Sequence, residues 1–121
     1  MRFGATSVAE SRQERRTQIC QGEVWWANLD PTVGREISKR RPCLVVSPDE
    51  MNAALATVLA APITSALRRW PSRVTVKLKG ADSFVALDQI RVLDKSRLIE
   101  KIERVEMHEV LGVLREMFRF T

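Results

Sequence analysis

The stretch from Pro42 to Ile63, PCLVVSPDEMNAALATVLAAPI, decides which fold class this chain can adopt. It contains two apolar runs, Pro42–Ser47 and Leu55–Ile63, and short continuous runs bounded by turn residues are typical of buried strands. Pro48–Asn52, between the two runs, predicts a short helical turn. Pro62 cannot donate a backbone hydrogen bond, so its place near the end of the second run favours a strand terminus or a bulge.

The segments on either side of this stretch predict further strands. Glu23–Leu29 (EVWWANL) is short and rich in β-formers, and Ser72–Lys79 alternates apolar and polar residues as a half-exposed antiparallel strand does. Ser83–Leu87 and Gln89–Leu93 are two more short strand candidates. From Met107 to Phe118, apolar residues recur instead at helical spacing. We therefore expect a mainly β fold (β plus α), a small β-barrel with one amphipathic C-terminal helix.

Length and composition place the chain among small single-domain proteins. Its 121 residues suffice for one hydrophobic core. Residues 1–20 are polar and lack a sustained period, so we expect a disordered or flexible extension there and the barrel domain at 21–121. With one histidine and two isolated cysteines, neither a zinc site nor another cofactor is expected. We find no signal peptide and no membrane span, which makes the cytoplasm the expected location.

The charge of the chain favours a polyanionic partner. Twenty basic residues against 15 acidic ones give a net charge of +5 and a pI of about 9.9. Within the predicted barrel, the basic residues gather at Arg35–Arg41 and Arg68–Arg73, in or beside predicted loops. Such clustering is typical of nucleic-acid-binding surfaces, although many basic proteins never bind nucleic acid.

The loop Asp30–Arg41, between two predicted strands, is the most pointed feature of the sequence. It carries Glu36 and a run of cations that ends in Arg41. Arg41 directly precedes Pro42 and a buried strand, so its backbone should be well fixed. A guanidinium has the fork geometry for bidentate phosphate contact, which predicts a phosphate-handling loop. The alternative is a solvated charged loop without chemistry.

Two residues outside this loop suit a nucleic-acid ligand, and each has an ordinary structural alternative. Thr64 directly follows the second buried run, so its hydroxyl can bond a phosphate oxygen or cap a turn. Trp70 stands beside Arg68 and Arg69, which suits base stacking with phosphate neutralisation, or simple packing of the loop.

The remaining reactive and aromatic side chains also admit more than one role. Asp88 follows an apolar run and is either a proton-transfer carboxylate or a turn former that pairs with Arg91. Trp25 and Trp26 are adjacent on a strand, so they point to opposite faces; either one of them is available to a partner, or both are buried because the strand lies under the helix. His108 has no second histidine beside it, which excludes a paired-histidine mechanism and leaves it as a surface residue.

Four sequence motifs follow one another from Gly22 onward. They are GEVWWANLDPTVGRE at Gly22–Glu36, RPCLVVSP at Arg41–Pro48, APIT at Ala61–Thr64 and LDQIRVLDKSRL at Leu87–Leu98. In this order and spacing they resemble the MazF/PemK (Kid) toxins of bacterial type II toxin–antitoxin modules. Each motif is weak by itself, but the four together are specific, and the resemblance leaves out only the N-terminal tail.

The resemblance implies an SH3-like β-barrel that forms a homodimer and cleaves single-stranded RNA (mRNA) at specific sequences without a metal. In such enzymes the ribose 2′-hydroxyl attacks the adjacent phosphate and leaves a 2′,3′-cyclic phosphate and a 5′-hydroxyl. The reaction needs a base, an acid for the leaving oxygen and cationic stabilisation of the phosphorane. The resemblance also implies a cognate antitoxin whose acidic tail competes for the same basic groove.

Matching positions carry the family's roles onto this chain. Arg41 matches the arginine before proline and would stabilise phosphorane charge, and Thr64 matches the threonine that ends the next strand and would bind a phosphate oxygen. Glu36 matches the acidic loop residue and is the candidate base, and Asp88 matches the aspartate of the PemK branch as a further catalytic candidate. The residues expected to bind RNA are Arg35, Lys39, Arg40, Ser65, Arg68, Arg69, Trp70 and Gln89.

Three positions depart from the family pattern. Ala86 replaces the arginine that the PemK branch pairs with its aspartate, Arg35 replaces a histidine, and Ile37 replaces a glutamine. We therefore expect the arginine–threonine scheme of the MazF branch. The alternatives are a catalytically silent module of the same fold that binds RNA or an antitoxin, or a gyrase-poison-like inhibitor that acts through the tip of its C-terminal helix.

Overall fold

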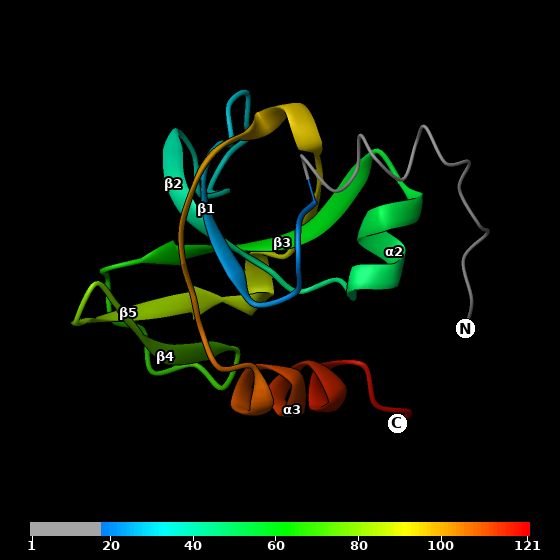
Figure 1. Cartoon of the computed structure of the whole chain (residues 1–121). Coiled ribbons are helices and arrows are strands. Elements are labelled where there is room, and N and C mark those ends of the chain that lie inside the picture. The colour runs from blue at the N-terminus through cyan, green and yellow to red at the C-terminus, as the bar shows by residue number, and fades with distance from the viewer. Residues whose placement is uncertain (1–17) are drawn as a thin grey trace.

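The computed structural model describes residues 18–121, which form seven strands and two helices (Figure 1). The helices are α2 (Asp49–Ala54) and α3 (His108–Met117), and two 3₁₀ turns, η1 (Leu87–Gln89) and η2 (Lys95–Arg97), flank β6. The strands are β1 (Glu23–Asn28), β2 (Arg40–Val45), β3 (Thr57–Thr64), β4 (Arg73–Leu78), β5 (Ala81–Ala86), β6 (Arg91–Asp94) and β7 (Leu98–Arg104). Most of the extension predicted at 1–20 lies outside the described residues.

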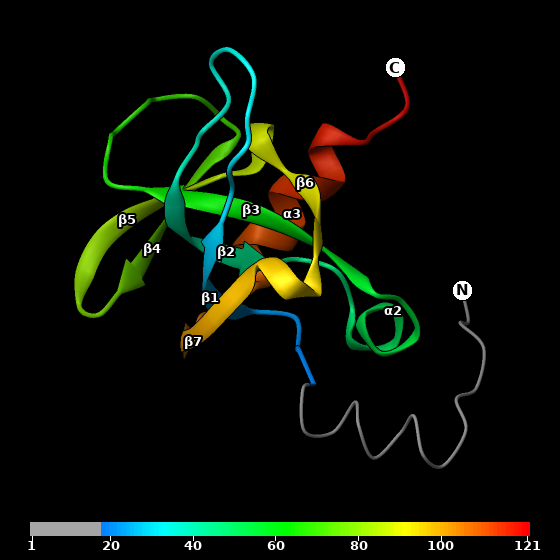
Figure 2. The same cartoon turned by 90° about the horizontal axis from the view of Figure 1, so that it is seen from above.

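All paired strands are antiparallel, and β3 is the centre of the sheet. The order is β4-β5-β3-β2-β1-β7, with β6 paired to β3 off this path. One edge of β3 pairs with β2, whereas the other edge pairs first with β6 and then with β5, so the sheet curls into a half-barrel (Figure 2). Pro62 lies two residues before the end of β3, where neither β6 nor β5 pairs with it.

Both faces of β2 and β3 are buried, which explains their continuous apolar runs. Leu44 and Val46 belong to a first cluster, which includes Val110 of α3. Cys43 and Val45 point the other way, into a second cluster inside the half-barrel. The second cluster also contains Ile19, Ala27, Leu29, Val58, Ala60 and Leu93. The predicted small barrel with one C-terminal helix is confirmed.

The predicted elements are present with shifted ends, and one further strand is present. Leu98–Arg104 (LIEKIER) was not predicted as a strand, because it mixes apolar and charged residues without a period of two. The hairpin between β4 and β5 turns at Lys79 and Gly80, whose φ angles of 52° and 80° match a tight hairpin turn.

Candidate active site

Arg41 and Thr64 lie on neighbouring strands and on the same face of the sheet. In the ladder of β2 and β3, Cys43 pairs with Pro62, and continuing this register by two residues sets Arg41 opposite Thr64. Side chains at opposed positions point to the same side of a sheet. The row continues on β5, where Phe84 pairs with Thr64. Continued in this way, the register places the two residues that match the family's arginine and threonine on neighbouring strands and on one face.

Both side chains keep hydrogen-bond donors available. Arg41 is half-buried and donates from Nε to the Ser38 carbonyl at 3.3 Å, so its two terminal nitrogens have no acceptor among residues 18–121. Thr64 Oγ1 accepts from the Ala66 N–H at 3.1 Å, which is the turn cap expected of a threonine at a strand end. Its hydroxyl proton remains able to donate, so Arg41 and Thr64 can together hold oxygens of one phosphate.

The neck of the loop between β1 and β2 is closed directly before Arg41. The Leu29 N–H donates to the Lys39 carbonyl, and the Lys39 N–H donates to Asp30 Oδ1, both at 2.9 Å. Arg97 of η2 donates from Nη1 to the carbonyls of Asn28 at 3.1 Å and Asp30 at 2.6 Å. These bonds fix both ends of the loop, and sequence reasoning did not single out Arg97.

The tip of this loop carries Glu36 in a turn of its own. Glu36 Oε1 accepts from the Val33 N–H at 2.8 Å, and the Glu36 N–H donates to the Val33 carbonyl at 3.3 Å. Oε2 has no partner within the part of the chain that the structure describes, so one carboxylate oxygen is available to accept a proton. Arg35, Lys39 and Arg40, in the same loop and at the start of β2, are exposed.

The middle of the loop is held from η1 and β6. The Ile37 N–H donates to Gln89 Oε1 at 3.2 Å, and Arg91 Nη1 donates to the Ile37 carbonyl at 3.1 Å. Arg91 Nη2 donates to the same Gln89 Oε1 at 3.1 Å. Gln89, predicted to bind RNA, thus uses its amide oxygen inside the protein and has only its amide nitrogen to offer a ligand.

Asp88 forms an ion pair, with a different arginine from the one predicted. Arg73 of β4 donates to both Asp88 oxygens, from Nε to Oδ1 at 2.8 Å and from Nη2 to Oδ2 at 3.1 Å, and Ser72 Oγ adds a bond to Oδ1 at 2.9 Å. The expected partner Arg91 points to the loop instead, because its acceptors lie there. The hydrogen bonds from Arg73 hold the pKa of Asp88 below its usual value.

Arg73 also packs under Trp70. Its guanidinium carbon lies 4.7 Å from the centre of the Trp70 ring, a cation–π distance. Trp70 is 51% exposed, so one face of the ring rests on a fixed guanidinium while part of the ring remains open to a ligand. Arg73 was not among the predicted site residues; its place opposite Ala86 depends on strand register, which the sequence does not reveal. The predicted residues Ser65, Arg68 and Arg69 are exposed in the same loop.

Two basic loops converge on η1: the first loop, between β1 and β2, and the second loop, between β3 and β4. The first loop bonds to Gln89, and the start of β4 bonds to Asp88, the residue before it. Seen from above, the loop between β1 and β2 and the loop between β3 and β4 project to the same side of the sheet (Figure 2). The predicted site residues therefore gather around one region, with Arg41 and Thr64 between the loops.

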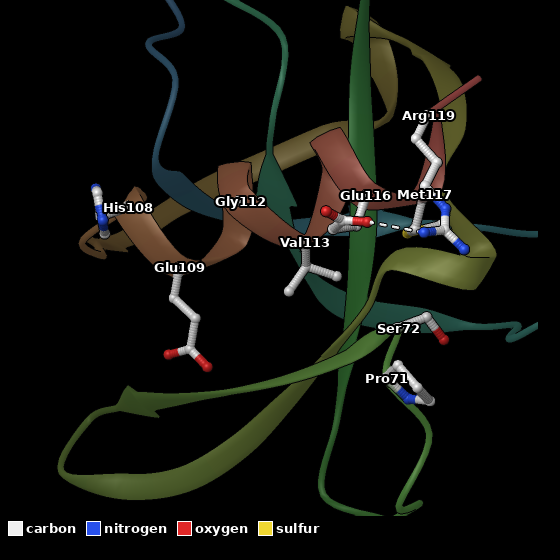
Figure 3. Close-up of a pocket in the computed structure, with 9 residues that line it drawn as sticks. All are labelled: Pro71, Ser72, His108, Glu109, Gly112, Val113, Glu116, Met117 and Arg119. Atoms are coloured by element: carbon white, nitrogen blue, oxygen red, sulfur yellow. Dashed lines mark ion pairs between the residues drawn. The ribbon is translucent and has the colours of Figure 1, made fainter. Parts of the chain in front are cut away.

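Two surface grooves are lined mainly by other residues. One runs between α3 and the start of β4, with Pro71 and Ser72 facing the helix and His108 near one end (Figure 3). His108 is exposed, as predicted. The other groove includes Trp26, which is 40% exposed while Trp25 packs on the second cluster, so the two tryptophans do point apart.

Cysteine and metal chemistry find no support in the described residues. Burial raises the pKa of the Cys43 thiol to about 12, which makes it a poor nucleophile at neutral pH. No group of three or more histidine, cysteine, aspartate or glutamate side chains within residues 18–121 is placed to hold a metal ion. Across the same residues, no helix has the length and apolar character needed to cross a membrane.

The fold is a small, mainly β half-barrel with a C-terminal helix, and two basic loops meet beside its central strands. The model of the family described as "PemK-like, MazF-like toxin of type II toxin-antitoxin system" matches residues 20–118. The chain therefore belongs to this toxin family, as the four motifs predicted.

Named endoribonucleases are among its relatives. Endoribonuclease MazF2 of Mycobacterium bovis is 40% identical over 109 residues, which cover 82% of this chain and 96% of the relative. Endoribonuclease EndoA of Bacillus subtilis is 36% identical over 94 residues, covering 73% and 81%. The prediction of a family of endoribonucleases is thus confirmed.

Solved structures show the same fold. MazF from Deinococcus radiodurans superposes with a TM-score of 0.72 and 33% identity, over 82% of this chain and 94% of that one. A MazE–MazF complex from the same organism gives a TM-score of 0.67 and 28% identity, over 85% and 97%.

Proposed function

We propose that this toxin is a metal-independent endoribonuclease that cleaves single-stranded RNA at specific sequences. The ribose 2′-hydroxyl attacks the adjacent phosphate, and the products carry a 2′,3′-cyclic phosphate and a 5′-hydroxyl. The observation that carries the proposal is the register of β2 and β3, which sets Arg41 opposite Thr64 beside a loop fixed at both ends. Family membership and the named endoribonucleases among the relatives support it.

Arg41 and Thr64 act on the phosphate. The terminal nitrogens of Arg41 donate to oxygens that gain charge in the phosphorane, and Thr64 donates its hydroxyl proton to another oxygen of the same group. One well-placed donor to a developing oxyanion contributes about 3–4 kcal/mol.

Glu36 is the proposed base, and Asp88 is the weaker candidate. Glu36 has an oxygen without a partner among the described residues and lies at an exposed loop tip, where a 2′-hydroxyl can reach it. Asp88 is committed to Arg73 through both oxygens, and its lowered pKa makes it a poorer proton acceptor. We assign Asp88 to holding the start of β4 beneath Trp70.

The RNA strand is bound by the two loops. The exposed cations of the first loop, Arg35, Lys39 and Arg40, neutralise phosphates on one side of the cut. Ser65, Arg68, Arg69 and Trp70 bind the strand on the other side, with Trp70 stacking on a base. Gln89 contributes its amide nitrogen.

An antitoxin with an acidic tail is the proposed protein partner. Complexes of MazE with MazF are known among the structural relatives. An acidic segment would occupy the basic loops and compete with RNA there. We further propose that the protein acts in the cytoplasm as a homodimer. Apolar residues exposed on α3 and after it support association of two copies; they are Leu111, Met117, Phe118 and Phe120.

A cleavage assay in EDTA tests the proposal. Purified protein is incubated with a long RNA, and the ends of the fragments are determined. We expect discrete cuts with 5′-hydroxyl ends, lost in Arg41→Ala and Thr64→Ala and retained in Arg104→Ala, an exposed arginine at the end of β7. Cuts that need added metal, or equal activity of wild type and Arg41→Ala, would contradict the mechanism. RNA binding without cuts would indicate the silent module.

A further inference from the structure

The barrel holds the middle of the first loop at Ile37. Its N–H donates to Gln89 Oε1 and its carbonyl accepts from Arg91 Nη1, at 3.2 and 3.1 Å. Its side chain packs on the second apolar cluster. One loop residue is therefore fixed by its donor, its acceptor and its side chain together.

Arg91 supplies most of this attachment. Its Nε donates to the Gln89 carbonyl at 3.2 Å, its Nη1 to Ile37, and its Nη2 to Gln89 Oε1 at 3.1 Å. It therefore both grips the loop and orients the Gln89 amide that grips the loop a second time. Arg91 lies on the same side of β6 as the buried Leu93, so its stem starts from the inside of the half-barrel.

The acceptors of Arg91 are neutral. It forms no ion pair with any carboxylate in residues 18–121, although its side chain is only partly exposed. The shape of the guanidinium matters here more than its charge, because each of the three neutral acceptors needs an N–H donor that points in a different direction. A lysine at this position would keep the positive charge but would donate from a single nitrogen atom.

The neighbours of Ile37 in sequence are the groups proposed to act on RNA. Glu36, the proposed base, precedes it, and Ser38, whose carbonyl accepts from Arg41 Nε at 3.3 Å, follows it. A shift of Ile37 would therefore displace Glu36 and also remove the acceptor that orients Arg41. Errors of this kind at a reacting centre are costly, since a misplacement of about 1 Å can lower the rate about 100-fold.

We infer that Arg91 is a positioning residue for the cleavage reaction: by locking Ile37 it holds Glu36 and the Arg41 guanidinium in their working positions. The inference deepens the proposed function and rests on it for its kinetic part. The lock itself has a separate readout, because Arg35, Lys39 and Arg40 make the loop a substrate for trypsin whenever it opens.

The test uses Arg91→Met and Arg91→Lys, with Arg104→Met as the matched control. Tryptic cleavage within 35–40 under native conditions should accelerate at least about fivefold in both Arg91 variants. In the RNA assay kcat should fall about 10- to 100-fold, while KM changes less than about threefold, because the exposed cations that bind the strand remain. Arg91→Lys should resemble Arg91→Met, and Arg104→Met should resemble wild type.

Each outcome decides the inference. Restored kcat and protection in Arg91→Lys would show that the charge alone matters and overturn it, as would unchanged tryptic rates in both variants. A rise in KM at constant kcat would make Arg91 an RNA-binding residue instead. If the wild-type protein makes no cuts, the proposed function fails, but the tryptic rates still show whether Arg91 holds Ile37 in place. If Arg91→Met does not fold, which its unfolding curve reveals, Arg91→Lys carries the same comparison.

Discussion

The loop between β1 and β2 and the loop between β3 and β4 carry similar charge but are held by the barrel in different ways. The first is bonded at its neck by Arg97 and at its middle by Gln89 and Arg91, all distant in sequence. Between Ser65 and Pro71, the described hydrogen bonds reach only near neighbours; for example, the Arg73 N–H donates to the Trp70 carbonyl. The first loop is therefore fixed by bonds to distant parts of the barrel, whereas most of the second loop is not.

We infer from this difference that the first loop positions the proposed catalytic residues, whereas the second loop serves mainly to bind the RNA strand. Catalytic groups must be placed before the substrate arrives, so they belong on or beside the fixed loop, where the proposed catalytic residues Arg41 and Glu36 lie. A strand of variable sequence is better bound by exposed cations and an open aromatic face, which the second loop offers in Arg68, Arg69 and Trp70. Changes at Arg41 or Glu36 should therefore affect mainly the rate, and changes in the second loop should affect mainly affinity.

Arg41→Ala should have the largest effect on the rate. Removing one donor to the phosphorane should lower kcat about 100- to 1000-fold, while binding of a non-cleavable 2′-O-methyl RNA changes little. Single-turnover cleavage and fluorescence titration measure the two quantities. The unfolding midpoint should remain near that of wild type, because Arg41 makes only one bond of its side chain within the described residues. An equal loss of affinity and rate would break the distinction between the loops.

Trp70→Ala should have the largest effect on affinity. Loss of a stacked base costs about 1–3 kcal/mol, so the 2′-O-methyl RNA should bind roughly 5- to 150-fold more weakly. Cleavage at saturating RNA should be nearly unchanged. Trp70→Phe keeps an aromatic face and should recover most of the affinity. If Trp70→Ala instead lowers kcat with unchanged affinity, the second loop belongs to the chemistry.

The sequence predicted the residues of the two loops better than the way the loops are held. Apolar runs mark both faces of β2 and β3 as buried, and the four motifs point to Arg41 and Thr64. The contacts of Asp88 could not be predicted, because they depend on Arg73 lying opposite Ala86 in the β4–β5 ladder, far apart in sequence. For the same reason the role of Gln89 inside the protein was missed. Strand register decides these contacts, and local composition does not encode it.

The charges of the second loop should appear in the salt dependence of binding. Each arginine that neutralises a phosphate of single-stranded RNA contributes about 0.7 to the slope of log affinity against log salt. The double variant Arg68→Ala/Arg69→Ala should therefore flatten the slope by about 1.4, with Arg104→Ala unchanged. Filter binding across a salt series measures it. An unchanged slope would remove these two arginines from the RNA interface.

Asp88→Asn should have the smallest effect, on the stability of the base of the second loop. The Arg73–Asp88 pair is bidentate, but Asp88 is partly exposed, so the loss in free energy of unfolding at pH 7 should be about 1 kcal/mol. The pKa of Asp88 is lowered in the folded state, so its contribution is present above the unfolded pKa of about 4. It disappears as the pH falls through the folded pKa.

Wild type and Asp88→Asn should therefore differ at pH 7 and converge in acid. Urea unfolding at a series of pH values measures this, and Asp82→Asn, which removes the exposed pair with Lys77, is the matched control with an expected effect near zero. Tryptic cleavage of the first loop should stay at the wild-type rate, because its attachments to Gln89, Arg91 and Arg97 do not involve Asp88. Faster cleavage of the first loop would mean that the two loops are coupled through η1, so that the attachment of one depends on the attachment of the other.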